Sequence, residues 1–381
     1  LVVAVLAACL AVSGQAAGAD DLDTVDQFLA RLGLVDLQIL HLEKALDREQ
    51  LDAVRLKLAQ RVADLYAGRL MSSSEDRQAY EELLRRIGAL VKKVPQANTP
   101  SLQVMLLQAD YNRAEAQVAR WIQDPAETSA RDAGRKVLAR ITPELNRFQQ
   151  QLDAAVTKLV KDLDEADDPD VRQAKEKQLE RLAAVAGRAA YFAAWSNYYT
   201  GLVNPASGGG KAEFAKARDG FRKLLGIEEK DYAKLAIESL GLDSIWRSRA
   251  MIGLGLSEAA AGNPDAAGAC FKLLEDVSVP PVIRDQAAYW HVQALLSAGR
   301  FDEAHRLAQQ RIAAFSGDAT PGTVSLCVAL VRAGFGPHDS PVPEDARAMG
   351  LLGISGLTRL RQFGTVHKLL EQYKVKLDEA S

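Results

Sequence analysis

One spacing of small residues occurs twice in this chain and constrains its fold more than any other feature. Gly262 is followed five positions later by Ala267, and Gly299 is followed five positions later by Ala304. The two copies are offset by 37 residues (304 − 267), and apolar residues at helical spacing flank both. A glycine in the left-handed conformation ends a helix, and a small residue on the next helix lets two backbones approach closely. The spacing therefore predicts two helical hairpins in tandem.

The stretch from Arg247 to Phe315 resembles a pair of tetratricopeptide repeats (TPRs), whose period is about 34 residues. The first copy matches the family pattern at Leu254-Gly255, Gly262, Ala267, Phe271 and Pro280. The second copy departs from it, with His291-Val292 for the Leu-Gly pair, Leu295 for the Tyr and Ala308 for the Phe. The match covers about a fifth of the chain. The resemblance implies an α-solenoid of stacked hairpins, a scaffold that serves many functions.

Hairpin patterns of the same kind continue on both sides of this pair. Ala217 and Phe221 repeat the alanine-to-phenylalanine spacing of the first copy. The helix expected before them carries the aromatic residues Tyr191, Trp195, Tyr198 and Tyr199. Residues 363–369 mirror the second helix of the second copy, and an irregular loop at 334–343 marks a degenerate repeat. We therefore expect a TPR-like array over residues 204–381.

A long antiparallel helical hairpin is predicted before the array, over residues 141–203. Thr142-Pro143 pairs a helix cap with a proline at the first helical position. Apolar residues step by three and four from Leu145 to Leu163, and a matching seam returns from Leu179 to Ala193. Such a narrow seam is typical of long helices packed at a shallow angle. Asp168 is expected to cap the returning helix.

A helical region is predicted before this hairpin, over residues 20–140. Helical periodicity on both sides of Gly33 indicates a short hairpin with a tight turn. Ser72-x-x-Glu75 predicts a capping-box start for a later helix. The prolines at 95–100 interrupt the pattern and indicate a linker.

The composition favours helices throughout, so the fold class that we expect is all-α. Aromatic residues make up 6% of the chain, whereas Ala, Leu, Arg, Gln and Glu are abundant. The formal net charge is −3, and both signs are interspersed. Neither a nucleic-acid-binding surface nor a surface for anionic membranes is indicated.

The first residues resemble a secretory signal. Leu1 to Val12 is an apolar run, too short for a transmembrane helix, which needs about 20 residues. Ala17-Gly18-Ala19 fits a small-x-small cleavage site, so residues 1–19 are predicted as a signal peptide and Asp20 as the mature N-terminus. The alternative is a lipobox at Leu6-Ala7-Ala8-Cys9, with a lipid anchor on Cys9. In both cases we expect export to the periplasm or cell envelope of a bacterium, with no integral membrane segment in the mature chain.

Two cysteines remain after Cys9. Cys270 and Cys327 lie far apart in sequence, in stretches that are both expected to be helical. A disulfide between them is the alternative, but a chain of this length does not need one, and two buried free thiols are expected.

No motif in the chain carries a catalytic constellation. Glu238-Ser239 invites comparison with lytic transglycosylases, exported helical enzymes whose catalytic acid is a Glu followed by Ser. The Gly-Leu-Met-Gln and Tyr-Asn motifs of that family are absent, and Leu240-Gly241-Leu242-Asp243 follows instead. We therefore expect Glu238 to be an exposed residue near a helix end. An envelope glycan hydrolase of this superhelical kind, or a degenerate relative, is kept as the alternative function.

Metal and cofactor sites are not predicted either. The five histidines and three cysteines show no H-x3-H or C-x2-C spacing, and the acidic run at 162–170 lacks the register of a calcium loop. No P-loop, dinucleotide-binding glycine motif or G-x-S-x-G elbow is present. No cofactor is expected.

The remaining candidate is a groove. In a TPR pair the first helix of each hairpin lines the concave face, which the resemblance assigns here to Arg249, Gln286, Tyr289 and Gln293. The last three step by three and four and form one stripe. A tyrosine flanked by amides suits an extended peptide, because it offers stacking area and hydrogen bonds at low entropic cost. The alternative is an ordinary solvated face.

The expected function is thus non-catalytic protein–protein interaction. The partner is a protein or peptide of unknown identity, held on the concave face of the TPR-like repeats.

Overall fold

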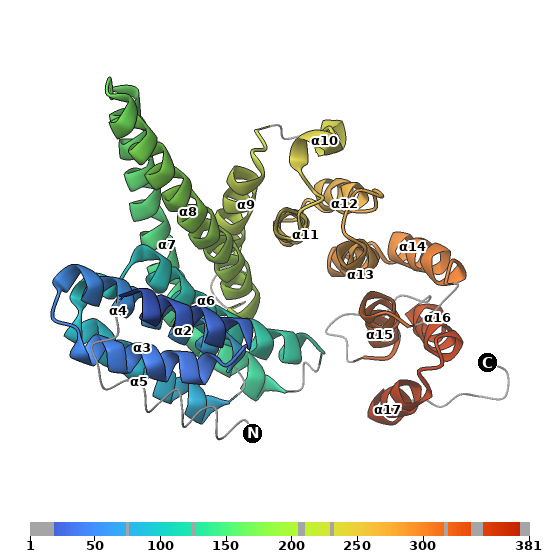
Figure 1. Ribbon diagram of the computed structural model, residues 1–381. Coiled ribbons are helices and arrows are strands. Elements are labelled where there is room, and N and C mark those ends of the chain that lie inside the picture. The colour runs from blue at the N-terminus through green and yellow to red at the C-terminus, as the bar shows by residue number, and fades with distance from the viewer. Residues whose placement is uncertain are drawn as a thin grey trace. The chain divides into compact units, whose positions relative to one another are not determined.

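The computed structural model describes residues 19–73, 76–123, 127–204, 210–228, 232–315, 319–336 and 346–373. In these ranges all regular structure is helical, with no β-strand (Figure 1). The all-α prediction is confirmed. Of the predicted signal segment 1–19 only Ala19 is described, so Cys9 lies outside the described residues. The chain divides into two compact units, Leu1–Val137 and Leu138–Ser381.

The described part of the first unit contains five helices and a short 3-10 turn, followed by the start of α7. Their bounds are α2 (Ala19–Arg31), α3 (Val35–Arg48), α4 (Asp52–Ser72), α5 (Arg77–Lys93), η1 (Pro95–Ala97) and α6 (Pro100–Gln123). Helix α4 packs against α3, α5 and α6. Its buried face carries Val62, Tyr66 and Leu70 into one apolar core with residues of those neighbours. Gly33, with φ +68°, forms the tight turn of the predicted α2–α3 hairpin.

Two predicted boundaries in this unit are wrong. Ser72 is the last residue of α4 and does not begin the next helix; the N-cap of α5 is Asp76, whose carboxylate accepts the Ala79 backbone N–H at 3.0 Å. Residues 95–100 are not a linker, because Ala97 is buried in the same core as the flanking helices. Ser72, Ser73 and Asp76 are all of residue types that cap helices, and the apolar periodicity of α4 runs on to Leu70 and Met71.

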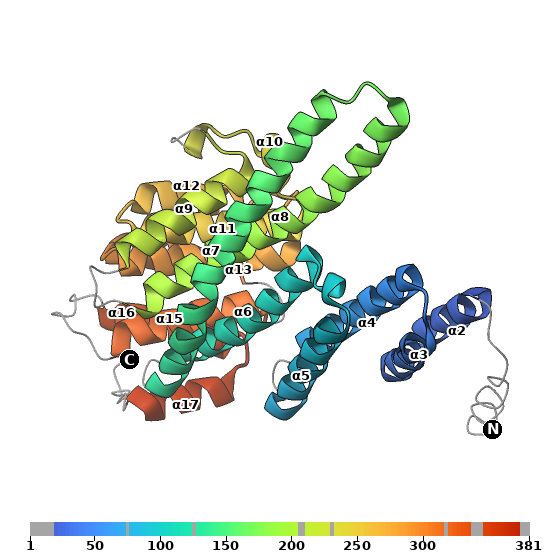
Figure 2. The ribbon, with the colours of Figure 1, turned by 90° about the vertical axis from the view of Figure 1, so that its left-hand side faces the viewer.

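The second unit begins with the long hairpin of α7 (Thr128–Asp164) and α8 (Pro169–Val203) (Figure 1, Figure 2). The helices run antiparallel: Thr142 Oγ1 lies 2.9 Å from Thr200 Oγ1, and Asn146 and Asn197 exchange amide hydrogen bonds of 3.1 and 2.9 Å. Asp168 caps α8 as predicted, accepting the backbone N–H of Asp170 at 2.8 Å.

The predicted helix start at Thr142-Pro143 is wrong, because α7 runs through this point without a break. A proline inside a helix costs about 3 kcal/mol, through one lost hydrogen bond and a steric clash. Leu138, Ile141 and Leu145 are fully buried on either side of Pro143. Each buried leucine or isoleucine contributes about 1.5–3 kcal/mol, so their packing outweighs the cost of the proline.

The rest of the second unit is a succession of helices that pack on their neighbours in chain order. The elements are α9 (Lys211–Leu225), η2 (Tyr232–Lys234), α10 (Ile237–Leu240), α11 (Ile245–Ala260), α12 (Pro264–Leu273), α13 (Pro281–Ser297), α14 (Phe301–Ala313), α15 (Pro321–Phe335), α16 (Ala346–Arg359) and α17 (Phe363–Tyr373). Helices α8, α11, α13 and α15 contact one another in turn, and each also packs on the helix that follows it: α9, α12, α14 and α16.

The tandem hairpins predicted at 247–315 are confirmed as α11–α12 and α13–α14. Gly262 and Gly299 adopt φ values of +86° and +72° at the two turns. Phe271 is fully buried and packs on Gly255, where an added Cβ would lie 2.8 Å from the ring. The hairpin predicted before them is α8–α9, in which the rings of Trp195 and Phe221 lie 5.2 Å apart. The predicted loops at 204–210 and 334–343 lie mostly outside the described residues.

The structure also tests the predictions made for Cys270 and Cys327 and for membrane-spanning helices. Cys270 and Cys327 are both buried and free, as predicted. Burial raises the pKa of both thiols. Within the described ranges, no helix combines the length and apolar character needed to cross a bilayer.

Candidate functional site

The four predicted partner-binding residues lie on two helices of the second unit that pack against each other. Arg249 is exposed on α11, and Gln286, Tyr289 and Gln293 are partly buried on α13. The structure thus brings the three α13 residues together on one helix and places Arg249 on its neighbour.

The α13 residues form a stripe on the side of the helix opposite α12. His291 marks the side that faces α12, because its ring lies 5.6 Å from that of Phe271. At about 3.6 residues per turn, positions 286, 289 and 293 lie roughly half a turn around the helix from position 291. We call Gln286, Tyr289 and Gln293 the α13 stripe.

Tyr289 is held in place by neighbours from several helices. Its ring centroid lies 4.5 Å from that of Trp290, and it packs against the apolar cluster of the C-terminal helices. Burial raises the pKa of the Tyr289 phenol, while the Arg332 guanidinium of α15 acts in the opposite direction. The phenol of Tyr198, on α8, has a pKa raised by burial and further by Tyr289. Tyr289 is therefore fixed by packing against Trp290 and the apolar cluster.

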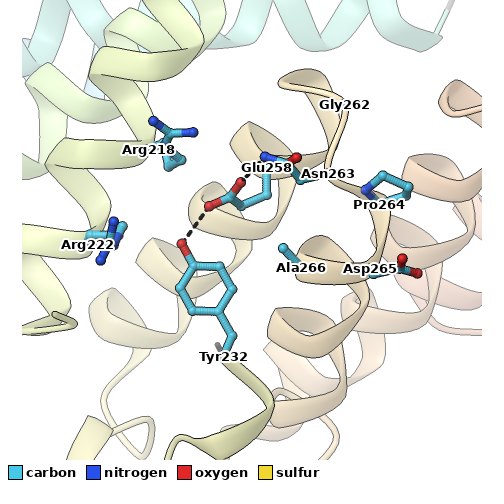
Figure 3. A pocket seen from close by; sticks show the side chains of 9 residues that line it. All are labelled: Arg218, Arg222, Tyr232, Glu258, Gly262, Asn263, Pro264, Asp265 and Ala266. Carbon is cyan, nitrogen blue, oxygen red and sulfur yellow. Dashed lines mark hydrogen bonds between the residues drawn. The ribbon is translucent and has the colours of Figure 1, made fainter. Parts of the chain in front are cut away.

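A second feature of this unit is a cavity of about 510 Å³ (Figure 3). Its lining residues come from α9, η2, the end of α11 and the turn into α12: Arg218, Arg222, Tyr232, Glu258, Gly262, Asn263, Pro264, Asp265 and Ala266. Figure 3 shows the two arginines on one side and the α11–α12 turn on the other, with Tyr232 and Glu258 between them. We call this space the α9–α12 cavity.

Glu258 is the buried charge of the cavity, with 5% of its surface exposed. Oε1 accepts the Tyr232 hydroxyl at 2.5 Å, and Oε2 accepts Asn263 Nδ2–H at 2.8 Å. A buried carboxylate needs such donors, since burying it unpaired is costly. Burial, and then the hydrogen bond to Glu258, raise the pKa of Tyr232, so its hydroxyl stays protonated and donates. Asn263 is the N-cap residue of α12, but its side chain does not cap that helix.

The two arginines give the opposite wall a positive charge. Arg218 and Arg222 lie one turn apart on α9, so their side chains leave the helix on the same side. Arg222 Nη2 donates to the backbone oxygen of Glu228 at 2.8 Å. Arg218 Nε lies 3.4 Å from the carboxylate of Asp219, which is itself largely exposed. An exposed ion pair of this kind contributes little and leaves Arg218 able to rearrange.

Sequence reasoning missed the α9–α12 cavity. Its residues come from four segments spread over about 50 positions, and no short motif links them. One signal was present: Glu258 is a charged residue within the apolar run of α11, where an acidic side chain is buried only with partners.

Glu238 and Ser239 are both exposed on the four-residue helix α10, as expected for Glu238 from the sequence. Across the residues that the structure describes, no three His, Cys, Asp or Glu side chains are grouped to hold a metal ion.

Comparison with protein-family models, with curated proteins and with solved structures finds no match to this chain. The site must therefore be interpreted from its own geometry.

Proposed function

We propose that this protein is a non-catalytic interaction protein that binds a protein or peptide partner. The binding surface is the face made by the first helices of TPR-like hairpins, stacked as an α-solenoid. The observation that carries this proposal is the α13 stripe, in which Gln286, Tyr289 and Gln293 lie partly exposed on one side of α13. The succession of α8, α11, α13 and α15, each packed on the helix that follows it, supports a stack of hairpins.

The chemistry of the α13 stripe suits an extended peptide. Gln286 and Gln293 each supply an amide that both donates and accepts hydrogen bonds to a peptide backbone. Tyr289 presents an aromatic ring. Contacts with Trp290 and the apolar cluster already restrict the rotamer of its side chain. A restricted side chain loses little conformational entropy on binding, so the contact favours affinity.

A matched pair of variants tests this proposal. Gln286→Ala/Gln293→Ala alters the stripe, and Gln309→Ala/Gln310→Ala makes the same chemical change at exposed positions of α14. Each variant, and the wild type, is incubated with envelope extract, and the retained proteins are quantified by mass spectrometry. We expect a partner held by the wild type and the α14 variant, and held about tenfold less by the stripe variant. Equal retention by all three proteins would reject the stripe as the binding surface.

We further propose that the protein acts in the periplasm or cell envelope. The apolar run Leu1 to Val12 and the small residues at Ala17-Gly18-Ala19 support this location. The first residue of the mature protein, read by mass spectrometry, checks it: Asp20 is expected, whereas a lipidated Cys9 would indicate the anchored form.

A further inference from the structure

The α2–α3 hairpin of the first unit carries a group of exposed apolar side chains. Single exposed apolar residues are common on proteins, whereas a contiguous group of them marks an interaction surface. Six large apolar residues that lie close together in the sequence are each 37–58% exposed here: Val25, Phe28, Leu32, Leu34, Leu37 and Leu40. We call these six residues the α2–α3 face.

Helical spacing places the α3 members of this face on the outer side of the hairpin. Helix α3 packs on α4 through a buried side that contributes to the core of the first unit. Leu37 and Leu40 lie one turn apart on the other side of α3, away from that core. Figure 2 shows α2 beside α3, so the outer side of the hairpin is formed by both helices.

Asp26 marks the opposite, inner side of α2. Its carboxylate accepts Gln38 Nε2–H of α3 at 2.6 Å and lies 3.4 Å from the Arg61 guanidinium of α4. At about 3.6 residues per turn, positions 25, 28 and 32 lie between roughly a quarter and half a turn around α2 from Asp26. These three apolar side chains therefore point away from α4, as the exposed leucines of α3 do.

The apolar area of the α2–α3 face suits a homodimer. At about half exposure each, six such side chains leave an area towards the upper end of the roughly 300–600 Å² found for the largest apolar patch of a monomeric protein. An interface of standard size buries about 800 Å² from each partner, and about 65% of a homodimer interface is apolar. One α2–α3 face thus offers about the apolar area that one copy contributes to a dimer.

The shape and charge of the face also suit a second copy. Two-fold symmetry sets the same face of both copies against each other, so one contact covers both. Two helical hairpins packed in this way repeat the helix-on-helix contact that α3 already makes with α4. The six residues are all uncharged, so the two copies bring no like charges together at the centre of the contact.

We propose that two copies of this chain form a two-fold dimer through their α2–α3 faces. Phe28, the most exposed of the six at 58%, supplies the largest contact area. Removing these apolar side chains from water drives the association. The dimer contact lies in the first unit and the α13 stripe in the second, so this inference does not rest on the proposed partner-binding surface.

Sedimentation equilibrium of the full chain tests the proposal. At about 100 µM protein, a contact with a dissociation constant of about 1 µM is nearly saturated, so we expect twice the mass of one chain. Phe28→Glu/Leu40→Glu places a charge on each helix of the face. It should weaken dimerisation by at least about 100-fold, because each copy then presents like charges to the other.

A matched variant separates the face from a general effect of charge. Val160→Glu/Val171→Glu adds the same two charges at exposed apolar positions of α7 and α8, in the second unit, and should remain dimeric. Circular dichroism checks that both variants are folded. A chain that begins at Asp20 lacks the apolar run Leu1 to Val12 and should dimerise as the full chain does.

Hydrogen exchange of the unmodified chain locates the contact without any substitution. Between about 1 and 100 µM protein, exchange in α2 and α3 should slow as the dimer forms, while exchange in α5 and α13 stays the same.

Four results would overturn the proposal. A single-chain mass for the wild type at the higher concentration would leave the face to an occupant other than a second copy. An equal loss of dimer in both glutamate variants would show a general charge effect. Concentration-dependent protection confined to other helices would place the contact elsewhere. Dimerisation that is lost in the chain from Asp20 would assign it to the apolar run.

The partner-binding proposal is tested separately. The Gln286→Ala/Gln293→Ala stripe variant should remain dimeric, because the α13 stripe takes no part in the contact. Phe28→Glu/Leu40→Glu leaves the stripe unchanged, so loss of the dimer and loss of the partner are read from different variants.

Discussion

Gly253 shows how the absence of one side chain sets the separation of two helices. It lies on α11, and an added Cβ there would be 2.3 Å from the ring of Phe221 on α9, which is fully buried. We expect Gly253→Ala to destabilise the protein by about 1–3 kcal/mol, because the ring has no space to move. Gly187 on α8 is the control, since nothing lies within 4 Å of an added Cβ. Gly187→Ala should stabilise by about 0.5–1 kcal/mol.

Urea denaturation followed by tryptophan fluorescence measures both variants. Opposite signs are the expected result, because the two substitutions share one chemical change and differ only in the space around it. A loss of stability of similar size in both would contradict the close α9–α11 approach.

Cys327 makes stability depend on alkaline pH. The thiol is fully buried, and burial raises its pKa from 9.0 to about 12. Between these values the unfolded chain has released the proton and the folded chain has kept it. The stability that the protonated Cys327 thiol contributes is therefore complete below pH 9. It is lost as pH rises, by up to about 1.4 kcal/mol per pH unit. Burial raises the pKa of Cys270 in the same direction.

The measurement is the unfolding free energy at several pH values between 8.5 and 10. Buried tyrosines whose pKa is also raised, such as Tyr198 and Tyr232, add to the fall near pH 10, so the thiol contribution is the difference between the wild type and the cysteine variants. Cys327→Ala should lower the slope between pH 9 and 10 and leave the Cys270 contribution, whereas Cys270→Ala/Cys327→Ala should remove both. An unchanged slope in the double variant would show that other groups cause the alkaline loss.

At the scale of helices, the sequence predicts what is decided locally. The turns at Gly262 and Gly299 require left-handed backbone, which glycine adopts at little cost, so their positions can be read from the residue type. The same holds for Asp168, whose carboxylate accepts the backbone N–H groups of Asp170 and Val171 and fixes the start of α8.

Helix boundaries that depend on packing were predicted less well. Pro143 has the local signature of a helix start, yet the buried side chains of Leu138, Ile141 and Leu145 hold α7 continuous through it. Ser72 has the signature of a cap, but the apolar face of α4 extends to that point, and Asp76 caps α5 instead. In both cases burial of neighbouring residues outweighs a local preference.

The two candidate sites differ in the same way, because one comes from a single helix and the other depends on how helices pack. The α13 stripe comes from one helix and follows from helical spacing, so the sequence predicted its residues together. The α9–α12 cavity joins Arg218, Tyr232 and Glu258 from three elements. Their proximity depends on how α9 packs on α11, and no spacing within the chain encodes that contact in a form that can be read from one sequence.

At the scale of the whole molecule, each of the two units has a core of its own. One apolar cluster lies entirely within Leu1–Val137, and another lies entirely within Leu138–Ser381. Helix α7 (Thr128–Asp164) is the element that belongs to both. Separate cores connected by a shared helix predict that the units open independently, as cooperative units of their own.

Leu42→Ala tests this independence. Leu42 is 2% exposed in the core of the first unit, so its truncation should cost about 2–5 kcal/mol. Hydrogen exchange read by mass spectrometry should show faster exchange in α3 and α4, and unchanged exchange in α11 and α13. Leu51→Ala makes the same change at a side chain that is 67% exposed and should alter neither region. If Leu42→Ala instead accelerates exchange equally in both units, the two units unfold together and the predicted independence is wrong.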